Sequence, residues 1–139
     1  MDATTTAVKD PRTLTKTELR RLFAAADAAG KAAASGTTPE PMVVQQHASM
    51  LNDASPVVKE WLVPDGVCGF AWVVIRPGNC RAANYAKAHW NARKDYYGGV
   101  SISCHDYNQS MTRKEAYAHA FAGVLRSAGI DARGQSRMD

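Results

Sequence analysis

The chain has few of the features that would place it in a specialised structural class. It contains only three cysteines in 139 residues, an odd number with no CxxC pair, so a disulfide framework is not expected. No apolar run approaches the roughly 20 residues that a membrane-spanning helix needs. The first ten residues, MDATTTAVKD, carry no basic-then-apolar signal pattern. These absences favour a cytoplasmic protein that has no membrane partner.

The sequence also lacks the motifs of common catalytic and cofactor sites. It contains no GxGxxG, no P-loop and no nucleophile elbow. His89, His105, His119 and the cysteines show none of the standard zinc spacings. Cys104 and His105 are adjacent in an expected strand, so they point to opposite faces and cannot act as nucleophile and base. We therefore expect no metal, no cofactor and no catalytic residue.

The composition is that of one globular domain, with 45% hydrophobic and 22% charged residues. The net charge of +4 is unevenly distributed. Seven basic and eight acidic residues precede Phe70, whereas ten basic and five acidic residues lie from Phe70 onward. The excess of positive charge in the C-terminal half indicates an anionic partner such as nucleic acid or a nucleotide.

The N-terminal part of the chain predicts one helix between two irregular segments. Residues 1–13 are polar and form a flexible lead-in. Thr15 and Glu18 form a capping box before a helix over 16–34, and Leu14 and Leu19 suit a hydrophobic staple. Residues 35–41 are a linker by composition, so 14–41 is treated as helix and linker. The small-residue stripe of this helix packs either on its own domain or on a partner.

Residues 42–63 admit two interpretations. Pro41 and Pro56 are each suited to open a short helix, with Ser55 as the cap of the second. Val43-Val44 and the segment 61–63 are equally suited to be pieces of strand.

Residues 42–139 are expected to form a single α+β domain with a small sheet. GFAWVVIR, residues 69–76, is apolar on both faces and predicts a central strand that is covered on both sides. A helix near 80–90 follows it. A second strand over 97–105 has Val100 and Ile102 on one face and Ser101 and Ser103 on a wetter face. The last ten residues end in a short strand or a tail.

The clearest helix signal covers residues 111–128. Tyr117, Phe121 and Leu125 recur at helical spacing, and Gly129 stands where a left-handed C-terminal cap is expected. Either Ser110 or Thr112 is suited to be the N-cap.

The candidate site combines two groups of residues. Their amides, hydroxyls, glycines and basic or aromatic side chains suit the stacking of a base and the binding of its phosphate. The residues are Arg93, Lys94, Tyr97, Gly98, Gly99, Asn108, Gln109, Ser110, Arg113 and Lys114. The competing interpretation is structural: Arg113 and Lys114 are solvated or pair with nearby acids, and Tyr97 packs on a sheet edge beside a glycine bulge.

Four segments, VCGFAWVVI, ARKDYYGGVSI, NQSMTRKEAYAHAFAGVL and SRMD, resemble a set of small uncharacterised proteins of tailed bacteriophages and prophages. The resemblance covers about residues 64–139 and includes all ten residues of the candidate site. The resemblance implies no particular activity. It implies a phage protein that acts in the cytoplasm of a bacterial host or is packaged in a virion.

These observations favour a non-enzymatic phage protein that binds a phosphate-bearing ligand, either nucleic acid or a nucleotide, and acts on host processes or host defence. One alternative is a protein–protein module, as a virion component, a homo-oligomer or an inhibitor of a host protein. The other is a small hydrolase that uses His105 and His119.

Overall fold

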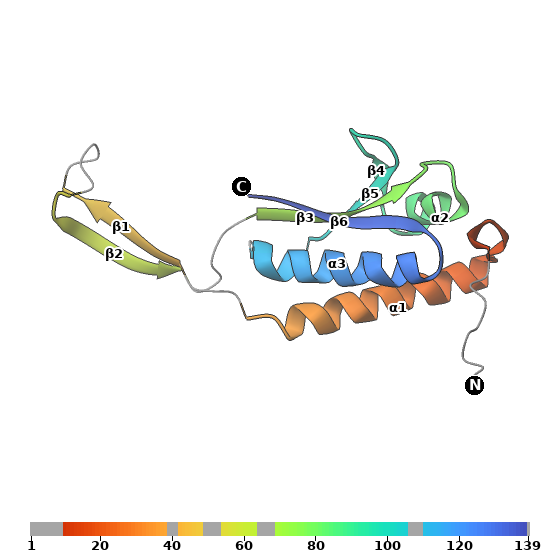
Figure 1. Cartoon of the computed structure of the whole chain (residues 1–139), viewed down its shortest axis with the longest axis horizontal. Coiled ribbons are helices and arrows are strands. Elements are labelled where there is room, and N and C mark those ends of the chain that lie inside the picture. The colour runs from red at the N-terminus through yellow and green to blue at the C-terminus, as the bar shows by residue number, and fades with distance from the viewer. Residues whose placement is uncertain (1–9, 39–41, 49–53, 64–68, 106–109, 139) are drawn as a thin grey trace.

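The computed structural model describes residues 10–38, 42–48, 54–63, 69–105 and 110–138, and it confirms the α+β class (Figure 1). The helical elements are η1 (Pro11–Thr13), α1 (Lys16–Ser35), α2 (Arg81–His89) and α3 (Met111–Ser127). The strands are β1 (Met42–His47), β2 (Val57–Val63), β3 (Gly69–Arg76), β4 (Arg93–Lys94), β5 (Val100–Ser103) and β6 (Asp131–Met138). None of the described helices combines the length and apolar character that crossing a membrane requires.

Helix α1 begins as the sequence predicts, with Thr15 as its N-cap. The Thr15 hydroxyl accepts a hydrogen bond from the Glu18 N–H at 3.1 Å, and the Glu18 carboxylate accepts one from the Thr15 N–H at 3.0 Å. This reciprocal capping box satisfies two backbone donors that would otherwise have no intrahelical partner. Leu14 and Leu19, the expected staple pair, are both buried.

Phe23 of α1 packs among aromatic rings from the other two helical segments. Its ring centroid lies 4.9 Å from that of Tyr85, 5.9 Å from that of Trp90 and 5.9 Å from that of Phe121. Phe23 and Phe121 are fully buried. The sequence left open whether the N-terminal helix packs on its own domain or on a partner. In the structure it packs on its own domain.

The larger sheet has the strand order β4-β5-β3-β6, and every neighbouring pair is antiparallel. Its elements run along the chain as β3-α2-β4-β5-α3-β6, the split βαβ connectivity of ferredoxin-like domains. The register pairs Gly69 with Met138 and Arg76 with Asp131, so β6 follows the whole of β3. The C-terminal residues are therefore a full strand.

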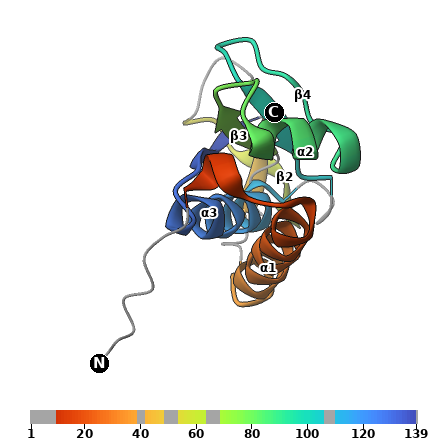
Figure 2. The same cartoon turned by 90° about the vertical axis from the view of Figure 1, so that its right-hand side faces the viewer.

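The helices all lie on one face of this sheet (Figure 2). Alternate residues of β3, Ala71, Val73 and Ile75, point into the core that the helices cover. Phe70 lies on the other face and is 41% exposed. The expectation that β3 is an interior strand is confirmed. The expectation that it is covered on both faces holds only in part: Val74 on the second face is 1% exposed, but Trp72 is half-buried and Phe70 is exposed. An apolar run on both faces of a strand indicates burial, yet it cannot distinguish a covering helix from a surface left for a partner.

Strand β5 is shorter than predicted, because residues 97–99 form a turn that joins it to β4. Within the strand the predicted faces are correct. Val100 and Ile102 are buried, whereas Ser101 and Ser103 are more exposed.

Helix α3 has the capping residues that its sequence indicates. Ser110 rather than Thr112 is the N-cap, and its hydroxyl accepts a hydrogen bond from the Arg113 N–H at 3.4 Å. Gly129 has a φ of +86°, in the left-handed region, and the Ile130 N–H donates to the Leu125 carbonyl at 3.1 Å. This is the Schellman arrangement that satisfies a carbonyl at the helix end.

Within residues 42–63, which admitted two interpretations, the described segments 42–47 and 57–63 are strands rather than helices. Strands β1 and β2 pair as an antiparallel hairpin in which Met42 lies opposite Val63. The hairpin projects away from the helices and the larger sheet (Figure 1). It exposes Val57, Val58 and Leu62.

Asp27 links α1 to α3. Its carboxylate accepts a hydrogen bond from the Tyr117 hydroxyl of α3 and forms an ion pair with Lys31 at 3.0 Å, one turn further along α1. Burial acts to raise the pKa of the Asp27 carboxyl, but the hydrogen bonds from Tyr117 and Lys31 outweigh it, and the pKa lies below its ordinary value of 3.8. The ionised form of Asp27 therefore stabilises the fold.

We expect this stabilisation to be lost in acid. Because the folded-state pKa is lowered, the contribution is complete above 3.8 and disappears as the pH falls through the folded pKa. Asp27→Asn should lower the free energy of unfolding at neutral pH, and its difference from the wild type should shrink in acid. Urea unfolding of both proteins over a pH series measures this. A difference that stays constant at every pH would contradict the assignment.

Gly30, in the interior of α1, is a glycine that close packing requires. A Cβ at this position would lie 2.6 Å from Cδ2 of the Tyr117 ring, well inside the optimal separation of about 3.5–4.0 Å between carbon atoms. The Tyr117 side chain is buried and bonded to Asp27, so it cannot move away freely. Helices α1 and α3 therefore approach each other closely at this point.

Gly30→Ala should destabilise the protein although alanine is the better helix former. Removal of the clash requires rearrangement that costs about 1–3 kcal/mol, which exceeds the gain in helix propensity of about 1 kcal/mol. Gly123→Ala in α3 is the matched control, because its Cβ would meet only Arg126 Nη2 at 3.7 Å. The control should gain about 0.5–1 kcal/mol. Chemical denaturation compares the two variants, and equal stabilisation of both would refute the packing argument.

Candidate functional site

The face of the sheet opposite the helices, which we call the open face, gathers aromatic and basic side chains. The ladder register determines which residues share it, because side chains alternate between the two faces of a strand. They are Phe70, Trp72, Val74 and Arg76 of β3, Asp131, Arg133, Gln135 and Arg137 of β6, Ser101 and Ser103 of β5, and Arg93 of β4.

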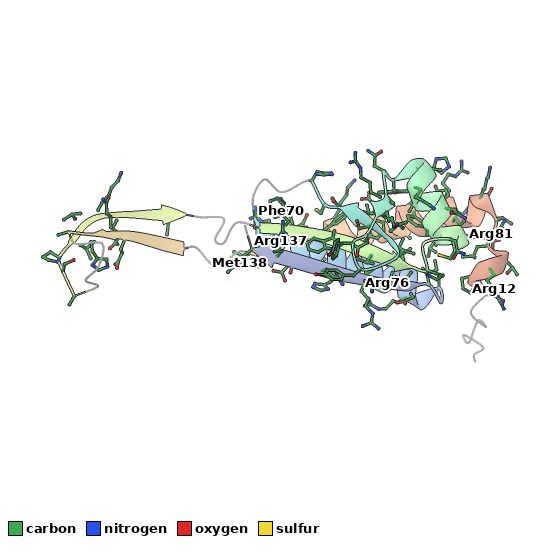
Figure 3. The ribbon with its side chains drawn as sticks, turned by 90° about the horizontal axis from the view of Figure 1, so that it is seen from above. Arg12, Phe70, Arg76, Arg81, Arg137 and Met138 are labelled. Atoms are coloured by element: carbon green, nitrogen blue, oxygen red, sulfur yellow. The ribbon has the colours of Figure 1, made fainter. Side chains whose placement is uncertain are left out.

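Phe70 lies at one end of this face beside two cations. The guanidinium carbon of Arg137 is 5.6 Å from the centre of the Phe70 ring, and Lys114 Nζ is 5.7 Å from it. Figure 3, which views the structure from above, shows Phe70 and Arg137 next to each other at this end of the sheet. Such cation–π contacts hold the ring in place and contribute about 0.5–1 kcal/mol each at exposed sites.

Four arginines make the open face positive. Arg133 forms an exposed ion pair with Asp131 at 3.8 Å, the weak kind of surface pair that leaves the guanidinium available to other anions. Arg76 is oriented by a hydrogen bond from its Nε to the Gly98 carbonyl at 3.1 Å. Arg93 and Arg137 are exposed. Basic groups therefore lie on β6, next to the aromatic side chains of β3, and on β4, which is separated from β3 by β5.

The first group of predicted site residues lies at the turn between β4 and β5. Gly98 and Gly99 have φ angles of +100° and +80°, and a Cβ on Gly99 would lie 2.4 Å from the Ile75 carbonyl oxygen. Glycine is required there because the turn closes tightly against the end of β3. Tyr97 is exposed, and its N–H donates to Asp95 at 3.1 Å. Arg93 and Lys94 form the short strand that precedes this turn.

The second group of predicted residues surrounds the start of α3. Ser110 is buried and caps the helix. Lys114 is only 4% exposed, and its Nζ donates to the Gly69 carbonyl at 3.3 Å. The Lys114 ammonium therefore has a structural partner at the beginning of β3. Arg113 is half-buried, and Asn108 and Gln109 lie outside the described residues.

The structure does not bring the two predicted groups together. The turn at Gly99 contacts Ile75 near the end of β3, whereas Lys114 contacts Gly69 at its beginning. At roughly 3.3 Å per residue, these ends of an eight-residue strand are about 23 Å apart. Of the predicted residues, the register places Arg93 on the open face.

Sequence reasoning missed four residues of the open face that suit ligand binding: Phe70, Trp72, Arg133 and Arg137. The sequence pattern that could have identified them is the alternation of side chains along a strand, in which every second residue shares one face. Phe70 and Trp72 alternate along β3, and Arg133 and Arg137 share one side of the C-terminal strand. The sequence does not show that these two strands pair, and only their pairing places the two sets of residues on one face.

A cavity of about 910 Å³ lies beside the open face, along the part of β5 that the two-residue β4 does not pair. Asp27, Lys31 and His105 are among its polar lining residues. Arg93 and Ser103 line both the cavity and the open face, so the two are continuous. A volume of this size is within the range of small-molecule sites, about 300–1,000 Å³.

The residues with catalytic or metal-binding chemistry do not converge. His105 lines the cavity, whereas His119 lies against β6, where its Nδ1 would be 2.8 Å from a Cβ on Gly134. Cys104 packs against the hydrophobic core. Within the described part of the chain, no group of three or more His, Cys, Asp or Glu side chains is arranged to hold a metal ion.

Comparison of the chain with protein families, with curated proteins and with solved structures gives no match. The arrangement of aromatic and basic side chains on the open face is therefore the basis for assigning a function.

Lys114→Ala should destabilise the fold, because it removes the donor to the buried Gly69 carbonyl. An unsatisfied buried acceptor costs about 1–3 kcal/mol. Lys87→Ala is the matched control, because Lys87 also donates to a glycine carbonyl, that of Gly78 at 3.0 Å, but from an exposed position. Urea unfolding should show a clearly larger loss for Lys114→Ala. Equal losses would contradict a buried structural role for Lys114.

Proposed function

We propose that the protein binds single-stranded nucleic acid on the open face of its sheet. The observation that supports this proposal is the placement of Phe70 and Trp72 on an interior strand, with Arg133 and Arg137 on the adjacent strand β6 and Arg93 on β4, beyond β5. Aromatic side chains stack on exposed bases, and flanking arginines bind phosphates. The excess of positive charge in the C-terminal half of the chain agrees with this chemistry.

A single strand fits this surface better than a duplex does. The bases of a duplex are stacked on one another, so a ring on a sheet cannot reach their faces, whereas an unpaired base presents its face freely. Serines at Ser101 and Ser103 add hydroxyl groups that donate and accept hydrogen bonds. Stacking and phosphate contacts are tolerant of sequence, so we expect weak sequence preference.

The resemblance to proteins of tailed bacteriophages supports a role during infection. We place the activity in the cytoplasm of the bacterial host, where single-stranded nucleic acid of phage or host is the ligand. Action on host processes, including host defence, is consistent with a small binding protein of this kind.

A protein–protein role is the second candidate, and the β1–β2 hairpin is the observation that favours it. An isolated two-stranded hairpin is marginally stable in water, and this one exposes Val57, Val58 and Leu62. The small-residue stripe of α1 no longer favours this role, because Ala26, Gly30 and other residues of the stripe are buried against the same chain. The separation of His105 from His119 gives no support to a hydrolase.

Binding to a single strand should weaken with salt. Each phosphate contact in a single-stranded complex contributes a slope of about −0.7 to the plot of log affinity against log salt. Three or four arginine contacts predict a slope of about −2 to −3. Arg133→Gln and Arg137→Gln should each make the slope shallower by about 0.7. Fluorescence anisotropy with a labelled oligothymidine at several salt concentrations tests this, and a salt-independent affinity would refute the proposal.

Phe70→Ala should weaken binding by about 1–3 kcal/mol through loss of one stacked base. The matched control is Leu62→Ala, which removes an exposed apolar side chain from the hairpin instead of from the open face. The control should bind as the wild type does. Thermal unfolding checks that both variants are folded. Equal affinities for wild type and Phe70→Ala would exclude the open face as the stacking surface.

A further inference from the structure

A second cavity, of about 500 Å³, lies at the end of the open face farthest from Phe70. It is formed where η1, the end of β3, the start of α2 and the connection from α3 to β6 meet. Three arginines from separate elements line it: Arg12 of η1, Arg76 of β3 and Arg81 of α2. Figure 3 shows Arg12 and Arg81 at this end of the molecule, and Arg76 between them and Phe70.

Each of these arginines is held in place through its Nε. Arg81 Nε donates to the Leu14 carbonyl at 2.8 Å, and Arg76 Nε donates to the Gly98 carbonyl at 3.1 Å. Arg12 donates to the Asp10 carboxylate from Nε and Nη2. Within the described residues, these bonds leave Nη1 of all three guanidinium groups without a hydrogen bond. The donors that remain are therefore oriented before any ligand arrives.

The oriented donors and the shape of the cavity favour an anion attached to an apolar group. Three arginines and one acid, Asp131, line the cavity. Two of the arginines also have an acidic partner outside the lining: Arg12 pairs with Asp10 at 2.9 Å, and Arg76 Nη2 lies 3.9 Å from Asp95. The attraction for an anion therefore comes from the oriented guanidinium donors that remain. Pro11, Pro77 and Ile130 supply an apolar wall beside them. The volume is too large for an inorganic ion alone and suits a nucleotide-sized group.

We infer that this cavity binds a phosphomonoester, and that its source is the phosphorylated end of the strand that lies on the open face. The inference rests on the proposed function. Arg76 belongs to both the cavity and the open face, so a strand on the sheet leads directly into the cavity. A terminal phosphate carries nearly two negative charges near neutral pH. It therefore binds three guanidinium groups more strongly than the singly charged phosphates within a strand do.

The test compares one labelled oligothymidine in three forms: with a 5′-phosphate, with a 3′-phosphate and with hydroxyl groups at both ends. We expect one phosphorylated form to bind the wild-type protein at least about tenfold more tightly than the hydroxyl form, the effect of about one charge-assisted hydrogen bond. If the hydroxyl form binds and neither phosphate improves binding, the inference is overturned and the proposed function survives. If no form binds, the proposed function and the inference both fail.

Two variants locate the effect. Arg12→Gln should reduce the affinity for the favoured phosphorylated strand to that of the hydroxyl strand, because Arg12 lines the cavity without belonging to the open face. Arg133→Gln is the matched control, and it should weaken all three forms alike and preserve their ratio. Loss of the ratio in Arg133→Gln, or its survival in Arg12→Gln, would overturn the assignment to this cavity.

Competition by thymidine monophosphate separates the two sources of a phosphomonoester. A free nucleotide should remove the advantage of the phosphorylated strand while leaving binding of the hydroxyl strand unchanged. A nucleotide that binds in an Arg12-dependent way, with no advantage for either phosphorylated strand, would show that the cavity takes free nucleotides. That result would overturn the strand-end assignment.

Discussion

The packing of Phe23 is the contact on which the arrangement of the domain depends. Its ring joins Tyr85 and Trp90, in and just after α2, to Phe121 of α3. Aromatic side chains bury large apolar areas, so this cluster holds the helical layer together. Because the layer forms on one face of the sheet, the other face is left for side chains that face solvent or a ligand (Figure 2).

The composition of the two faces follows from that asymmetry. The covered face is filled by small and branched apolar residues such as Ala71, Val73 and Ile75, while the open face carries Phe70 and arginines of β6. Phe70 is exposed, so its side chain adds little to the hydrophobic core. The charged Arg137 guanidinium packs beside its ring. The aromatic and basic side chains on this face are the basis of the ligand-binding role that we propose.

The cavity lined by Arg12, Arg76 and Arg81 extends the same chemistry beyond the sheet. The three arginines come from elements far apart in the chain, and backbone or carboxylate oxygens orient each of them. Preorganised donors lose little entropy when they bind an anion. We propose that the open face and this cavity together form one surface, on which bases stack near Phe70 and a terminal phosphate binds near Arg76. Figure 3 shows these residues along the molecule.

The sequence by itself determined the local structure, because caps and periodicity act over a few residues: Thr15 with Glu18 and Gly129 define helix ends that the structure confirms. Where local signals were balanced, as in residues 42–63, only tertiary structure distinguished a hairpin from short helices.

The candidate site could not be predicted from local sequence patterns, because it depends on the pairing of strands that are far apart in the chain. Lys114 has an ordinary helical position in the sequence, but in the structure it is buried against Gly69. Phe70 and Arg137 become neighbours only when β6 pairs with β3, since strand pairing brings distant segments together and helix packing selects the face that stays open.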